Sequence, residues 1–136
     1  MKLNKNDILE ILKKYKFDSK EYIIISSASL VLQDVKKYTT DIDIACSDDL
    51  YKILLKEYNC LLEKIDGQYK VWYIDDLINF SVHYYEETEY IELFGYKVQT
   101  IESVLNLKKN LNREKDKDDI KLILDFYKNK NKQIYK

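Results

Sequence analysis

Two aspartates separated by one residue, Asp41 and Asp43, are the chemically most informative feature of this sequence. On a β-strand alternate side chains share a face, so their carboxylates should lie side by side while Ile42 and Ile44 point into a core. Carboxylate oxygens suit Mg²⁺, which usually takes one or two carboxylates together with substrate phosphates. Without a cation the two groups would repel, and one would tend to be protonated. The pair therefore predicts a metal site.

A turn of small residues precedes this pair. Ser26 and Ser27 follow the apolar run 22–25, and residues 27–33 have helical spacing. A small-residue turn that opens a helix could present backbone N–H groups to phosphates. Alternatively, Ser27 only caps the helix that follows. Because the turn stands directly upstream of two candidate metal ligands, we favour the first interpretation and expect a metal–nucleotide site.

The order of strand, small-residue turn, helix and Asp-x-Asp strand resembles the nucleotidyltransferase superfamily, which has a polymerase-β-like fold. The resemblance is to small bacterial members, the minimal nucleotidyltransferases and those related to abortive-infection toxins. Residues 26–30, SSASL, stand where the family has Gly-Gly-Thr-Ala-Leu, and residues 37–43, KYTTDID, resemble its Arg-x-Thr-x-Asp-hydrophobic-Asp. Ser26 replaces the first glycine, and serine fits less well than glycine if that position needs a positive φ.

A third carboxylate of the family lies on a later strand, within a hydrophobic-Asp-hydrophobic pattern. The best match here is Asn79, within an alternating segment that predicts a strand over 77–84. Asn79, Ser81 and His83 would form its polar face. An amide cannot act as a general base, although its carbonyl oxygen can ligate a metal weakly. His83 is either a substitute base or a polar surface residue.

Two later segments also resemble the family. Residues 98–108 are similar to its leucine-x-leucine-lysine helix, and residues 113–120 to its Arg-x-Lys-Asp-x-x-Asp-Ile ending. Lys108 borders the apolar stripe of its helix, where it could pair with triphosphate oxygens or extend past core residues. Asp116 and Asp119 are expected to cap and pair within the last helix. The resemblance as a whole implies a two-ion Mg²⁺ site on Asp41 and Asp43. It implies a catalytic group of Asp41, Asp43 and Asn79, with nucleotide contacts from Ser26, Ser27, Lys37 and Lys108.

Composition limits the other function classes. The 136 residues, 46% hydrophobic and 35% charged, predict one domain over 1–136 with a loose tail at 130–136. There is no apolar run of membrane-spanning length and no apolar signal segment, so we expect a cytoplasmic protein without a membrane partner. Two cysteines and one histidine do not suggest a zinc cluster. Residues 108–136 hold ten Lys/Arg against five Asp/Glu, which suits either RNA contact or a solvated helix face.

The predicted elements alternate between helices and strands. Apolar periodicity and cap residues predict helices at 6–15, 27–33, 47–58, 100–111 and 116–129, and strands at 22–25, 41–45, 60–64, 68–73, 77–84, 90–94 and 96–99. This order predicts an α/β fold with a mixed central β-sheet covered by helices, nucleotidyltransferase-like by resemblance.

The resemblance therefore implies metal-dependent transfer of a nucleotidyl group from a nucleoside triphosphate to a hydroxyl of a protein, an RNA or a small molecule. The alternative is a catalytically weakened relative that acts by binding a nucleotide or a partner, as a toxin–antitoxin component. Asn79 and Ser26 motivate that alternative. A third hypothesis, a non-enzymatic RNA-binding module, depends on the basic C-terminal segment alone.

Overall fold

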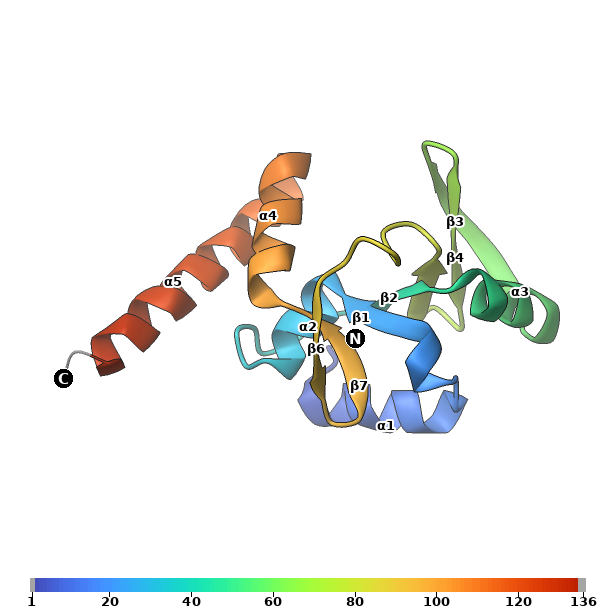
Figure 1. Cartoon of the computed structure of the whole chain (residues 1–136), viewed down its shortest axis with the longest axis horizontal. Helices are drawn as coiled ribbons and strands as arrows, with labels where there is room; N and C mark the ends of the chain where they lie inside the picture. Colours follow the sequence, from blue (N-terminus) through green and yellow to red (C-terminus); the bar gives the residue numbers. More distant parts are fainter. Residues whose placement is uncertain (1, 135–136) are drawn as a thin grey trace.

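A seven-stranded sheet forms the centre of the computed structural model, which describes residues 2–134 (Figure 1). The strands are β1 (Tyr22–Ile25), β2 (Ile42–Cys46), β3 (Cys60–Asp66), β4 (Tyr69–Ile74), β5 (Ile78–Ser81), β6 (Tyr90–Leu93) and β7 (Tyr96–Gln99). Their order across the sheet is β3-β4-β5-β2-β1-β7-β6, so β2 lies in the middle. The strand that carries the Asp-x-Asp motif is thus the central one.

Parallel and antiparallel pairs both occur in this sheet. β2 is parallel to β5 and antiparallel to β1, and β1 is parallel to β7. The β3–β4, β4–β5 and β6–β7 pairs are antiparallel. The predicted α/β class with a mixed sheet is confirmed.

Five α-helices accompany the strands within residues 2–134: α1 (Lys5–Tyr15), α2 (Ser26–Leu32), α3 (Asp48–Glu57), α4 (Ile101–Leu111) and α5 (Lys117–Ile134). Short 3₁₀ turns at Ser19–Glu21 and Glu114–Asp116 precede β1 and α5. The predicted caps Ser47 and Thr100 accept hydrogen bonds from the backbone of α3 and α4, as expected for N-cap hydroxyls. α1 starts one residue earlier than predicted, because Asn4 and Asp7 form a capping box.

Two apolar clusters hold these elements together. In the larger, Ile8 and Leu12 of α1 and Leu54 of α3 join Ile44 and Phe80 of the central strands. In the smaller, Leu30 of α2 packs with Val104 of α4 and Ile123 of α5. α4 and α5 are therefore anchored to the sheet through α2, and α5 extends away from the sheet (Figure 1).

Most predicted boundaries differ by one or two residues, so that β2 begins at Ile42 and Asp41 lies directly before it; two differ by more. β5 ends at Ser81, not Tyr84, because the Ser81 hydroxyl accepts the His83 N–H at 3.2 Å and the chain turns there. His83 and Tyr84 are consequently not on the strand. α5 continues to Ile134, beyond the predicted end at Asn129, so residues 130–134 of the predicted loose tail are helical; residues 135–136 lie outside the described part. None of the helices in residues 2–134 has both the length and the apolar character needed to cross a bilayer.

Candidate functional site

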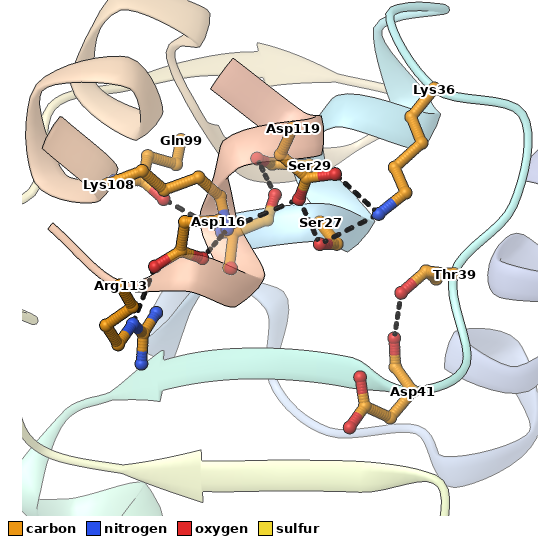
Figure 2. A network of polar contacts seen from close by, with 11 residues as sticks. Ser27, Ser29, Lys36, Thr39, Asp41, Gln99, Lys108, Arg113, Asp116 and Asp119 are labelled. Atoms are coloured by element: carbon orange, nitrogen blue, oxygen red, sulfur yellow. Dashed lines mark hydrogen bonds and ion pairs between the residues drawn. The ribbon is translucent and has the colours of Figure 1, made fainter. Parts of the chain in front are cut away.

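Asp41, Asp43 and Asn79 meet where β2 runs beside β5. The parallel register places Asp43 directly opposite Asn79, so their side chains share a face of the sheet. The Asn79 amide Nδ2 donates a hydrogen bond to Asp41 Oδ2 at 3.0 Å. The Thr39 hydroxyl donates to the Asp41 carbonyl oxygen at 3.1 Å, which fixes the chain as it enters β2 (Figure 2). The two aspartates and the predicted counterpart of the third carboxylate therefore form one polar group.

This group opens on a cavity of about 600 Å³. Its walls come from the central strands, the start of α2, the β3–β4 hairpin and the corner between α4 and α5. Six of the seven predicted site residues line it: Ser26, Ser27, Asp41, Asp43, Asn79 and Lys108. Segments far apart in the sequence are thus brought to one space large enough for a small-molecule ligand.

Lys37 is the predicted residue that the cavity does not include. Its side chain is exposed on the loop between α2 and β2, whereas the neighbouring Lys36 lines the cavity. Lys36 Nζ lies 2.7 Å from Asp119 Oδ1 and 3.4 Å from Ser27 Oγ. A cationic contact from this loop would therefore come from Lys36, one residue from the position that the motif match indicated.

Ionisation of the Asp43 carboxyl group is electrostatically unfavourable. Burial, the charge of Asp41 and the charge of Glu63 raise its pKa from 3.8 to about 7, although Asn79 and Lys64 act in the opposite direction. Among the described side chains, no lysine or arginine forms an ion pair with Asp41 or Asp43. The expected repulsion between the two carboxylates is present, and a bound cation would relieve it.

A second acidic pair, Asp116 and Asp119, is placed among cations (Figure 2). Lys108 Nζ lies 2.9 Å from Asp116 Oδ1 and 3.3 Å from Asp119 Oδ2. Arg113 Nε lies 2.6 Å from Asp116 Oδ2. Asp119 also forms an ion pair with Lys36 and accepts a hydrogen bond from Ser27 Oγ at 2.9 Å. We call these residues the ion-pair network: Ser27, Lys36, Lys108, Arg113, Asp116 and Asp119.

The ion-pair network keeps both of its carboxylates charged. Burial by itself would raise the pKa of Asp116, but hydrogen bonds from Arg113 and Lys108 outweigh that effect and lower it. Burial likewise opposes ionisation of Asp119, and hydrogen bonds from Lys36 and Ser27 lower its pKa. The expectation that these aspartates pair only within the last helix is wrong, because Asp119 contacts residues from α2, the following loop and α4. Lys108 is only 4% exposed and forms ion pairs with both carboxylates.

Ser26 has the backbone conformation that the family pattern assigns to glycine. Its φ is 59°, in the left-handed region that costs a residue with a Cβ atom free energy. The Ser26 N–H donates to Gln99 Oε1 at 2.9 Å, and the Gln99 amide donates to Ser103 Oγ at 2.9 Å. A non-glycine residue held at positive φ beside a cavity is typical of functional sites.

The donor set suits one kind of metal site. Among the described residues there is no group of three or more His, Cys, Asp or Glu side chains able to hold an ion. Asp41 and Asp43 supply two hard carboxylates, and Asn79 adds an amide beside them. Mg²⁺ suits such a set, because it keeps waters and takes further ligands from substrate phosphates.

Sequence reasoning missed further charged residues of the cavity wall, among them Glu63 and Lys64. Both lie on β3, where the pairing with β4 is irregular between Leu62 and Lys64. Their charges are visible in the sequence, but the irregular pairing that puts Lys64 on the same face as Glu63 is not.

Comparison of the chain with protein-family models, with curated proteins and with solved structures found no match.

Proposed function

We propose that this protein is a nucleotidyltransferase with a nucleotidyltransferase-like fold, which transfers a nucleotidyl group from a nucleoside triphosphate to a hydroxyl acceptor. The observation that carries the proposal is the Asp41–Asp43 pair: two adjacent carboxylates, without an ion-pair partner among the described side chains, at the wall of a cavity of about 600 Å³. A site whose charges are left unbalanced in this way is suited to a cation that arrives with a polyphosphate.

Each residue has a role in this proposal. Asp41 and Asp43 would hold Mg²⁺, with Asn79 positioning Asp41 through its amide hydrogen bond. The bound ions would supply charge stabilisation for the attacking and leaving oxygens. Ser26 and Ser27 line the cavity and would lie beside the phosphates, and Lys36 is a cation on the adjoining loop that also lines it. Lys108 would contact phosphate only if its pairs with Asp116 and Asp119 rearranged. The acceptor is a protein, an RNA or a small molecule.

A second candidate function is binding without turnover, as a nucleotide sensor or a toxin–antitoxin component. Asn79 favours it, because an amide stands where the resemblance implies a carboxylate, and Ser26 adds a strained residue at the glycine position. The Asn79→Asp substitution separates the two candidates. If transfer appears only in that variant, the wild-type protein acts by binding.

The direct test is incubation of the full chain with α-labelled nucleoside triphosphates, Mg²⁺ and cell extract. We expect label in an acceptor with wild-type protein, and a loss of about 100-fold to 1,000-fold with Asp41→Asn, as for removal of one group that stabilises charge in the transition state. Asp49→Asn, an exposed aspartate on α3, is the matched control and should label like wild type. Equal labelling by Asp41→Asn, or no labelling by any form, would reject the proposal.

A further inference from the structure

The strand β3 carries a bulge that changes which side chains reach the cavity. Leu62 pairs with Trp72 of β4, but the next pair joins Lys64 to Val71, so Glu63 is an extra residue on its strand. A bulge of this kind adds one residue to one strand and redirects the side chains around it, often beside a binding site. Without it, strict alternation would send Glu63 and Lys64 to opposite faces.

Glu63 lies on the face of the sheet that carries the aspartates, and the bulge turns Lys64 to the same face. Across the sheet, Asp43 is opposite Asn79, Asn79 is opposite Tyr73, and Tyr73 is opposite Leu61. Two residues after Leu61, Glu63 falls on the same face by alternation, and it lines the cavity. Its charge is also one of the three causes that raise the pKa of Asp43, which places the two carboxylates within electrostatic reach.

The other acidic groups of the cavity wall make different interactions. Asp116 and Asp119 are neutralised in the ion-pair network. Asp118 lines the α5 side of the wall, and within residues 2–134 the acidic charges that raise the pKa of Asp43 are those of Asp41 and Glu63. Asn79 has no basic atom. Because the described residues hold no three-carboxylate metal group, Glu63 is placed beside the metal-binding pair and outside a direct ligand set.

We propose that Glu63 is the general base of the transfer reaction, accepting the proton of the acceptor hydroxyl; this inference rests on the proposed function. As the proton passes to the Glu63 carboxylate, the acceptor oxygen forms a bond to the α-phosphorus. The bond from that phosphorus to its bridging oxygen breaks, and pyrophosphate leaves with the electron pair. Glu63 then returns the proton to water. The acceptor therefore enters between the β3–β4 hairpin and the aspartate pair.

Glu63→Gln tests this role, because it keeps the size of the side chain and removes its basicity. We expect kcat for transfer to fall by about 100-fold to 10,000-fold, the usual contribution of a general base. The affinity for the magnesium complex of an α,β-methylene nucleoside triphosphate, measured by calorimetry, should remain within about twofold of the wild-type value. Glu92→Gln, on the exposed edge strand β6, is the matched control and should change neither quantity.

A second variant guards against a merely structural effect. Asn79→Asp places a carboxylate opposite Asp43, so the double variant Glu63→Gln/Asn79→Asp should recover at least about tenfold of the lost rate. An unchanged rate in Glu63→Gln, or a nucleotide affinity that falls together with the rate, would overturn the role of Glu63 while leaving the proposed function standing. If wild type and the Asn79→Asp variant both fail to transfer, the proposed function is rejected and the base assignment with it.

Discussion

Two pairs of aspartates face the same cavity in opposite electrostatic states. Asp43 on β2 and Asp41 directly before it have no ion-pair partner among the described side chains, and the pKa of Asp43 is raised to about 7. Asp116 and Asp119, at the corner of α4 and α5, are surrounded by Lys36, Lys108 and Arg113, and their pKa values are lowered. The two pairs have the same side chain, but Asp116 and Asp119 are buried whereas Asp41 and Asp43 are partly exposed, and their neighbours differ.

This difference separates a structural pair from a reactive one. A buried carboxylate stays charged only where cations and hydrogen bonds replace the water that it has lost. In the ion-pair network that replacement is supplied by the chain, so Asp116 and Asp119 attach α5 to α2 and α4. At Asp41 and Asp43 the chain does not supply these compensating cations, so a bound metal ion or substrate would have to supply the positive charge. Such uncompensated groups are typical of metal and substrate sites.

Removing the cation shared by Asp116 and Asp119 should have the largest effect on stability. Lys108→Met keeps the length of the side chain and takes away its charge, so two buried carboxylates lose a partner. We expect the free energy of unfolding to fall by about 3 kcal/mol, since breaking a buried pair leaves an uncompensated charge. Urea denaturation of the variant and the wild type measures the difference. Lys109→Met, an exposed neighbour on α4, should change stability by less than about 0.5 kcal/mol.

A small effect in Lys108→Met would mean that Lys36 and Arg113 suffice for both carboxylates. The charges of Asp116 and Asp119 would then be compensated by the ion-pair network as a whole and not mainly by Lys108.

The two acidic pairs should respond to pH in opposite directions when no divalent metal is present. Between pH 3.8 and about pH 7 the folded state keeps a proton on Asp43 that the unfolded state releases, so stability from this group falls as pH rises through that window. The pKa values of Asp116 and Asp119 are lowered, so their contribution is present above pH 3.8 and is lost as pH falls further.

Asp43→Asn isolates the first of these effects. The variant should be more stable than wild type at pH 8, by on the order of 2 kcal/mol after allowing for partial solvent exposure of the carboxyl group, and should lose the decline between pH 4 and pH 7. Thermal unfolding in chelator at a series of pH values gives both quantities. A variant that is less stable than wild type at pH 8 would show that Asp43 is compensated after all.

Substitutions at the two serines should have smaller effects of opposite sign. Ser26→Gly removes the cost of a Cβ atom at φ 59° and should raise the free energy of unfolding by about 1 kcal/mol. Ser27→Gly removes the hydroxyl that donates to Asp119 and should lower it by about 1 kcal/mol. Urea titrations of both variants test whether Ser26 belongs to the strained wall of the site and Ser27 to the ion-pair network. Destabilisation by Ser26→Gly would show that Ser26 is not a strained residue of the cavity wall.

Features that depend on neighbours in the chain were predictable. The alternation of Asp41 to Ile44 predicted two carboxylates on one face of a strand and two isoleucines in the core, and Ile42 and Ile44 are buried. The caps Ser47 and Thr100 were predicted because an N-cap hydroxyl bonds to an N–H only two or three residues away. The end of β5 was not, because the turn after Ser81 is stabilised by hydrogen bonds that periodicity does not reveal.

The sequence alone therefore determined that two acidic side chains stand together at the start of a buried strand, because a period of two needs no information from elsewhere in the chain. Only the tertiary structure decided what surrounds them. Strand pairing set Asn79 opposite Asp43 and brought Glu63 to the same face, a one-residue bulge turned Lys64 to that face, and helix packing placed Lys36 beside Asp119, 83 residues away, and not beside the Asp41–Asp43 pair. Charge compensation depends on distance in space, so the same residue type becomes structural in one place and reactive in another.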